Sequence, residues 1–153
     1  METTAKAISG SGYDITPIDD ETRQRLAADL TEEQRYVLLD SGTEAPFCGT
    51  LTDTEDAGIY ACRLCGLPLF SSDNKFHSGS GWASFYAPFD KEHLRYLTDT
   101  KFGMVRTEIR CARCDGHQGH VFPDGPPPSG QRYCLNSAAL EFFPAGEEVP
   151  QKI

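Results

Sequence analysis

The sequence has no long apolar run, few basic residues and a single tryptophan. No stretch approaches the ~20 apolar residues that span a bilayer, so we expect no membrane partner. The N-terminus lacks the basic and apolar regions of a secretory signal, which favours the cytoplasm, where thiols stay reduced. Lys and Arg number 14 against 23 Asp and Glu, a net charge of −9. Nucleic acid is therefore a poor partner, because phosphate binding needs a basic surface.

The length of 153 residues predicts one domain with a modest core. Residues 1–17 are small and polar and show no period, so we expect a flexible N-terminal segment followed by a single domain over 18–153. The acidic excess lies in residues 1–60, which hold 13 acidic and four basic residues. We expect a monomer.

Two short helices are predicted before residue 45. The first covers about 19–30, with Leu26, Ala27 and Leu30 on one face. The Thr31-Glu-Glu-Gln34 stretch is typical of a capping box, and Gly42 fits the stop of a second helix ending near Ser41.

Short strands between Gly, Pro and Ser turns are predicted from residue 58 onward. The alternation of Val105, Thr107, Ile109 and Cys111 with charged residues is the period of a half-buried strand. The absence of a βαβ pattern favours a mainly β domain of antiparallel sheets. The candidate strands are 58–62, 67–70, 94–98, 105–111, 121–122, 132–135 and 140–143.

Four of the six cysteines form two C-x-x-C clamps. In each clamp two thiolates of one tight turn can face one ion, and the glycine that follows lets backbone N–H groups approach the sulfurs. The spacing of the two clamps predicts a closed tetrahedral Zn²⁺ site, one per chain, with a structural role. Two redox dithiols or two disulfides are the alternative. The predicted ligands are Cys62, Cys65, Cys111 and Cys114.

Four arginines lie within or near the clamps. They would offset the formal charge of about −2 on a zinc ion with four thiolates, or they are ordinary solvated surface. These residues are Arg63, Arg106, Arg110 and Arg113.

The densest chemistry lies between His117 and Ser137. Arg132 and Cys134 are two residues apart, so on a strand they share a face, and a guanidinium favours thiolate over thiol. His117 and His120, which we expect in a glycine turn, can converge on one small volume. A lone cysteine beside histidines is typical of a nucleophile. The alternatives are an inert buried cysteine, and histidines that bind metal or hydrogen-bond in a turn.

The lone Trp82 lies in Ser78-Gly-Ser-Gly-Trp82-Ala-Ser-Phe85. Its glycine neighbours could present the ring at a pocket wall, where an indole face suits polarised methyl groups. A core position is the alternative for a single tryptophan.

Together these motifs resemble the type B methionine sulfoxide reductases, which reduce the R epimer. The match covers about residues 30–144. It includes Gly42-Thr-Glu-Ala-Pro-Phe47, both clamps, the Trp82 segment, His117-Gln-Gly-His120-Val-Phe122 and Arg132-Tyr-Cys134-Leu-Asn136-Ser137. The last two blocks are very specific.

The resemblance implies two antiparallel sheets of the β-tent, Mss4-like type with short N-terminal helices, so that residues 18–153 form a catalytic domain. It implies Cys134 as the nucleophile, with His117, His120 and Asn136 around the sulfoxide oxygen. Trp82 would pack on the substrate's terminal methyl group. Arg132, Phe122 and Asp124 match positions near the site. The substrates would be oxidised proteins or peptides, or free methionine-R-sulfoxide.

This chain departs from the common family pattern at Ser80, where many members carry a resolving cysteine. Cys48 is the other thiol outside the clamps, so we predict that it condenses with the Cys134 sulfenic acid to give a disulfide that thioredoxin reduces. An incidental cysteine, with recycling by external thiols, is the alternative. The chain also has Trp82-Ala where the family usually has Trp-Pro.

Two non-enzymatic functions compete with this hypothesis. A zinc-bound module that binds another protein would explain the clamps and the acidic N-terminus, but it gives no reason for Cys134, two histidines and Cys48 together. A zinc ribbon that binds nucleic acid conflicts with the charge.

Overall fold

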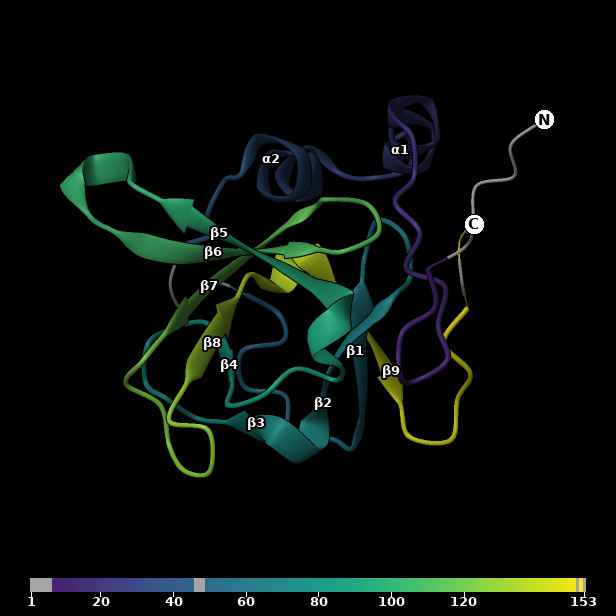
Figure 1. Ribbon diagram of the computed structural model, residues 1–153. Helices are drawn as coiled ribbons and strands as arrows, with labels where there is room; N and C mark the ends of the chain where they lie inside the picture. The colour runs from purple at the N-terminus through teal and green to yellow at the C-terminus, as the bar shows by residue number, and fades with distance from the viewer. Residues whose placement is uncertain (1–6, 46–48, 151, 153) are drawn as a thin grey trace.

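The computed structural model describes residues 7–45, 49–150 and 152. In this part of the chain two helices precede nine strands, which form two sheets (Figure 1). The three-stranded sheet has the order β2-β1-β9, and the six-stranded sheet has the order β3-β4-β8-β7-β6-β5. Every pairing between these strands is antiparallel. The mainly β fold with two antiparallel sheets is confirmed.

Six of the expected segments agree with strands to within one residue, but β7 begins four residues before the expected segment 121–122. Strands β3 and β4, of two and three residues, were not predicted. The strands are β1 Gly58–Cys62, β2 Pro68–Ser71, β3 Lys75–Phe76, β4 Ala83–Phe85, β5 Leu94–Asp99, β6 Arg106–Cys111, β7 His117–Phe122, β8 Arg132–Leu135 and β9 Leu140–Pro144. Four short 3₁₀ turns lie between strands, at Ser72–Asn74, Lys91–His93, Lys101–Gly103 and Ser137–Ala139.

Helix α1 (Asp20–Ala27) is shorter than predicted. Asp19 lies outside it as the N-cap, and its side chain accepts a hydrogen bond from the Thr22 amide at 2.8 Å. Helix α2 (Glu32–Asp40) begins with the predicted capping box, in which the Gln34 amide donates to the Thr31 hydroxyl and the Thr31 amide donates to the Gln34 side chain. Neither of these helices is long and apolar enough to cross a bilayer.

Helix α2 ends at Asp40, close to the predicted end near Ser41, and its C-cap is Ser41 and not Gly42. Ser41 has the left-handed backbone conformation (φ 56°), and its amide donates to the Tyr36 carbonyl. Gly42 is required for a different reason. A Cβ there would lie 2.2 Å from the Tyr36 ring.

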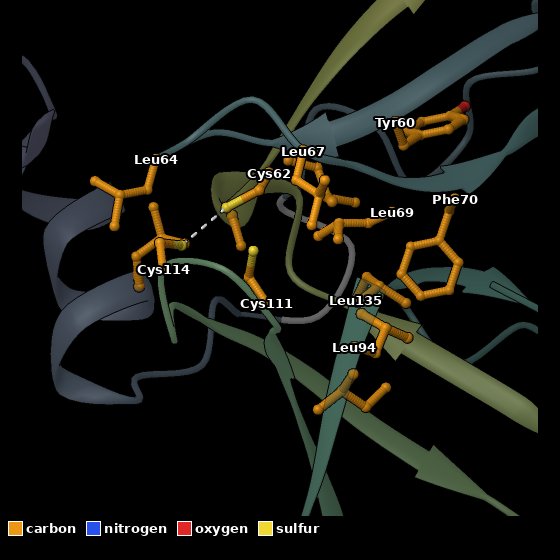
Figure 2. Close-up of a cluster of buried hydrophobic side chains, with 14 of the residues drawn as sticks. Tyr60, Cys62, Leu64, Leu67, Leu69, Phe70, Leu94, Cys111, Cys114 and Leu135 are labelled. Carbon is orange, nitrogen blue, oxygen red and sulfur yellow. Dashed lines mark hydrogen bonds between the residues drawn. The ribbon is translucent and has the colours of Figure 1, made fainter. Parts of the chain in front are cut away.

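Both sheets contribute aromatic rings to one core. Tyr60 of β1 packs edge-on against Phe85 of β4, with ring centroids 5.1 Å apart. Phe70 of β2 stacks on Phe85 at 4.6 Å and also contacts Tyr133 of β8. Each fully buried ring stabilises the fold by about 2–3 kcal/mol. Figure 2 shows this cluster continuing through leucines to the clamp cysteines.

Residues 7–18 lie against the turn before β5. The Ser9 hydroxyl hydrogen-bonds Nε2 of the buried His93 at 2.8 Å, and the Gly10 amide donates to the Glu92 carboxylate. Ile18 donates to the carbonyl of Arg113. Residues 1–6 lie outside the described part of the chain, and the boundary at residue 17 stays a prediction.

Candidate metal centre and active site

The two clamps are built alike. Each begins at the end of a strand, β1 at Cys62 and β6 at Cys111, whose amides donate to the carbonyls of Leu67 and Gly116. A residue with positive φ closes each turn. It is Gly66 (φ 85°) in the first clamp and Asp115 (φ 62°), not Gly116, in the second. Gly116 instead brings its amide to 3.4 Å from the Cys114 sulfur, the approach that we expected of this glycine.

The four clamp sulfurs meet in the core. All lie within 4.8 Å of one another, and the Cys62–Cys114 and Cys65–Cys111 sulfurs are each 3.5 Å apart. Figure 2 shows the sulfurs of Cys62, Cys111 and Cys114 directed toward one another. A tetrahedral zinc ion with Zn–S bonds of about 2.3 Å requires sulfurs roughly 3.8 Å apart. The donor set therefore fits a metal ion of this kind.

The hydrogen bonds around the sulfurs are also consistent with a bound cation. Hydrogen bonds with Cys111 raise the pKa of both Cys65 and Cys114, so these two sulfurs keep their protons more readily in the absence of a cation. A metal ion would replace these protons. The Gln118 side-chain amide donates to the Cys62 sulfur at 3.4 Å and can lower the charge on it further.

Three of the four arginines near the clamps pair with carboxylates. Arg106 binds Asp99, Arg110 binds Glu108 and Asp115, and Arg113 binds Asp14. Arg63 donates to the Leu140 carbonyl. They are thus neither freely solvated nor direct partners of the sulfurs.

A cavity of about 330 Å³ opens at the middle of the six-stranded sheet. Seven of its lining residues were assigned to the site or discussed there from the sequence: Ser80, Trp82, His120, Phe122, Arg132, Cys134 and Asn136. Thr43, Arg106 and Gly119 complete the wall.

Cys134 lies in β8 with 9% of its surface exposed. As expected for residues two apart on a strand, Arg132 shares its face, and Nη1 of Arg132 donates to the Cys134 sulfur at 2.9 Å. The other guanidinium nitrogens bind both oxygens of Asp124 at 3.0 and 3.1 Å, and Phe122 lies 4.5 Å beneath the guanidinium carbon. The Asp124 carboxylate raises the pKa of Arg132, with a smaller contribution from Cys134. Arg132 is therefore a fixed cation that favours the thiolate.

Asp124 itself does not line this cavity. Its side chain is 65% exposed and faces an adjoining surface groove next to Arg132. It reaches the cavity through the guanidinium alone.

His120 is paired with a carboxylate on β5. Its Nε2 lies 2.8 Å from Oδ2 of Asp99, which also accepts from Arg106 at 3.0 Å. The Lys101 amide, and then His120, lower the pKa of Asp99 to about 2, so it is a carboxylate at neutral pH. An ionised partner fixes Nε2 as the donor and leaves Nδ1 to receive or deliver a proton.

His117 forms a second pair of the same kind. Its Nδ1 lies 2.7 Å from Oε2 of Glu108, which also binds Arg110 at 2.9 Å. Burial opposes ionisation of Glu108, but hydrogen bonds from Arg110 and His117 outweigh it and lower its pKa. Burial lowers the pKa of His117 in spite of this carboxylate, which favours a neutral ring. Its Nε2 is buried and has no hydrogen-bond partner in the described part of the chain.

The two histidines converge because of a bulge and not a glycine turn. Strand β7 continues through both residues, and the register with β6 shifts so that Arg110 faces His117 while Ile109 faces Gly119. Gln118 is the extra residue, which returns His117 to the face of His120. The rings are 5.6 Å apart, but His117 is 2% exposed and His120 alone lines the cavity.

Trp82 and Asn136 are fixed by the backbone of one residue, Glu44. The Trp82 Nε1 donates to the Glu44 carbonyl at 3.0 Å, and the Glu44 amide donates to Oδ1 of Asn136 at 3.0 Å. The buried Glu44 carboxylate accepts from the Ala138 amide. Trp82 is half-buried and lines the cavity, so its position is not that of a core residue.

Sequence reasoning missed Asp99, Glu108 and Glu44. The alternation over 105–111 placed Glu108 on the exposed face, but it is buried and Val105 is 81% exposed. The nearness of Glu108 to the two histidines could have identified it, but that nearness follows from the register between β6 and β7, which the sequence does not give. Cys48, the predicted resolving residue, lies outside the described residues.

This chain is similar to a protein-family model and to curated relatives from several bacteria. The SelR domain model matches residues 30–144. The peptide methionine sulfoxide reductase MsrB of Caulobacter vibrioides (strain NA1000 / CB15N) is 56% identical over 151 residues, which is 99% of this chain and 95% of the relative. The MsrB of Xylella fastidiosa (strain M23) is 54% identical over 141 residues, 92% of this chain and 91% of the relative. The MsrB of Hahella chejuensis (strain KCTC 2396) is 53% identical over 134 residues, 88% and 94% respectively.

Proposed function

The chain belongs to the SelR family of type B methionine sulfoxide reductases, and from this membership we propose that Cys134 reduces the R epimer of methionine sulfoxide in proteins, in peptides or in the free amino acid. The observation that carries the proposal is the 2.9 Å contact between Arg132 and the Cys134 sulfur inside a cavity bounded by Trp82 and His120. A cation, an indole and an imidazole around one thiol are the groups that sulfoxide reduction needs.

The reaction transfers one oxygen atom. The Cys134 thiolate attacks the sulfoxide sulfur while the sulfoxide oxygen takes up a proton, since protonation makes that sulfur electrophilic. The sulfur–sulfur bond formed by this attack and the S–O bond of the substrate then break as oxygen passes to Cys134, so that sulfoxide and thiol become methionine and a cysteine sulfenic acid. Methionine sulfur is reduced by two electrons and the cysteine sulfur is oxidised by two.

The acid in this step is His120, directly or through water. It lines the cavity, and Asp99 would stabilise its imidazolium. His117 assists from behind the wall, where its unpartnered Nε2 can accept a hydrogen bond from a bound water. The Asn136 Nδ2 donates one hydrogen to the Gln118 carbonyl and has a second for the oxygen. Trp82 and Phe122 supply the apolar surface for the methyl group.

Cys48 then condenses with the sulfenic acid, releasing water and forming a disulfide that thioredoxin reduces by exchange. Described residues on both sides of Cys48 support this proposal. Thr43 lines the cavity, and an added Cβ on Gly49 would lie 2.4 Å from the Ser137 hydroxyl. Recycling by external thiols is the alternative.

Zinc bound by the four clamp cysteines would have a structural role, because a closed tetrahedral shell of four thiolates leaves no coordination position for substrate. The resident cation would hold the two sheets together. We further infer a monomer in the cytoplasm, where the five described cysteines, none of which forms a disulfide, would stay reduced.

The test is single-turnover reduction of methionine-R-sulfoxide, followed by mass spectrometry of Cys134. The zinc-loaded parent should form one methionine per chain, and Cys134→Ser should form none. Cys48→Ser should keep this turnover and the dithiothreitol activity, but lose recycling by thioredoxin. Full thioredoxin activity in Cys48→Ser would remove Cys48 from the cycle. Turnover that survives in Cys134→Ser would overturn the function, and no turnover by the parent would favour a non-catalytic interaction module.

A further inference from the structure

Three serine hydroxyls form a connected cluster beside the Cys134 sulfur. Oγ of Ser80 lies 3.7 Å from this sulfur and Oγ of Ser84 lies 3.9 Å from it. Ser78 joins the two, with its hydroxyl 2.7 Å from that of Ser80 and 2.6 Å from that of Ser84. We propose that Ser80 and Ser84 are catalytic donors that stabilise the Cys134 thiolate and then the sulfenic acid oxygen, and that Ser78 positions them.

The sheet fixes this arrangement. Ser84 lies in β4 directly opposite Cys134 in β8, so the two side chains are on the same face. Ser84 is 1% exposed, which confines its hydroxyl to the partners around it. Ser80 is half-buried and lines the cavity, so it can reach both the sulfur and a group bound to the sulfur.

The hydrogen count of the cluster allows two states. Each serine has one hydroxyl hydrogen and can also accept. In one state Ser84 donates to the Trp82 carbonyl at 3.1 Å and receives a hydrogen from Ser78, so that its oxygen can accept from the Cys134 thiol. In the other state Ser84 and Ser80 rotate their hydrogens toward the sulfur. The cluster can therefore match a thiol that donates and a thiolate that only accepts, without movement of the backbone.

The second state stabilises negative charge that develops on the sulfur or on the transferred oxygen. Arg132 supplies one donor to the sulfur from its own strand, and the serines supply donors from the neighbouring strand. Donors fixed in place before the reaction stabilise developing charge more than mobile water does. Ser80 gains particular importance in this chain, because a hydroxyl at this position can hold a sulfenic acid oxygen but cannot condense with it to a disulfide.

This inference rests on the proposed role of Cys134. Its test distinguishes a failure of the serine proposal from a failure of the proposed function. The variants Ser80→Ala and Ser84→Ala are made in the Cys48→Ser background, so that the sulfenic acid persists. Two quantities are measured: the pH at which iodoacetamide alkylation of Cys134 reaches half its maximal rate, and the lifetime of the sulfenic acid, trapped with dimedone after one turnover. A structural role alone would change neither quantity.

Each alanine variant should move the alkylation midpoint up by roughly half to one pH unit, since a hydrogen bond to the charged form favours it. Single turnover should slow about tenfold, the loss expected for one hydrogen bond to a charged group. The sulfenic acid should decay several times faster. Ser80→Thr keeps the hydroxyl and should restore all three values. Ser71→Ala, in the three-stranded sheet, should match the parent.

Metal content and circular dichroism establish that each variant is folded. If Ser84→Ala misfolds, the less buried Ser80→Ala decides the question. Parental alkylation midpoints and sulfenic acid lifetimes in folded alanine variants would overturn the serine proposal and leave Cys134 as the nucleophile. Methionine formation by Cys134→Ser would instead overturn the proposed function itself.

Discussion

Each histidine of the site is held by a carboxylate that is itself held by an arginine. His120 depends on Asp99 and Arg106, and His117 depends on Glu108 and Arg110. Hydrogen bonds keep each carboxylate ionised, chiefly from the Lys101 amide at Asp99 and from Arg110 at Glu108. The ionised carboxylate then selects the tautomer of the ring. The proton chemistry of the cavity is therefore set by residues that do not contact the reacting sulfur.

Replacing Asp99 by Asn should lower the single-turnover rate about 100-fold, the usual contribution of one positioned acid. An amide can hold the His120 ring but has no negative charge to balance a proton on it. Asp29→Asn, at an exposed position between the helices, is the control and should match the parent. A parental single-turnover rate in folded Asp99→Asn would contradict the proposed role of His120 as the acid.

Asp99 should also give the fold a pH dependence. Its pKa of about 2 in the folded chain lies below the ordinary value of 3.8, so its stabilising effect is complete above about pH 4 and disappears as the pH falls toward 2. The stability difference between the parent and Asp99→Asn, measured by urea unfolding, should shrink as the pH falls from 4 toward 2. A difference that does not change down to pH 2 would mean that Asp99 titrates normally.

At the level of elements, signals between close neighbours were read correctly from the sequence and signals between strands were not. The capping box joins Thr31 and Gln34, which are three residues apart, and the shared face joins Arg132 and Cys134, which are two apart. Both can be recognised within one short segment of sequence. The bulge at Gln118 depends on the register between β6 and β7, which no single segment contains. That register decides that Glu108 is buried and that His117 faces His120. The same limit hid Asp99, which lies 21 residues from its histidine.

The end of α2 offers a direct test of local backbone strain. Ser41 adopts φ 56°, a conformation that costs an L residue roughly 1–2 kcal/mol, whereas glycine adopts it freely. Ser41→Gly should raise the free energy of unfolding by about 0.5–1 kcal/mol after the entropy of the unfolded chain is counted. Ser41→Ala keeps the strain and removes only the hydroxyl, so it should not be stabilised. Equal stability of the two variants in urea would show that Ser41 is not strained.

For the whole molecule, the two clamps bring four cysteine sulfurs together where the two sheets meet. Cys62 and Cys65 follow a strand of the three-stranded sheet, and Cys111 and Cys114 follow a strand of the six-stranded sheet. Cys134, the proposed nucleophile, lies two strands away from β6 in the second sheet, where β8 follows β7. The proposed metal binding at the clamps and the proposed chemistry at Cys134 therefore depend on different cysteines and can be tested separately.

Two matched cysteine variants test this separation. Cys65→Ser should lose the metal and, because metal-binding energy is folding energy, lower the thermal midpoint by about 10–20 °C. Cys134→Ser makes the same atom change in the same protein, yet it should keep one zinc per chain and stay within a few degrees of the parent, while it loses all turnover. Elemental analysis, thermal unfolding and the single-turnover assay measure the three properties. A metal-free Cys65→Ser as stable as the parent would show that the two sheets hold together through the aromatic core alone.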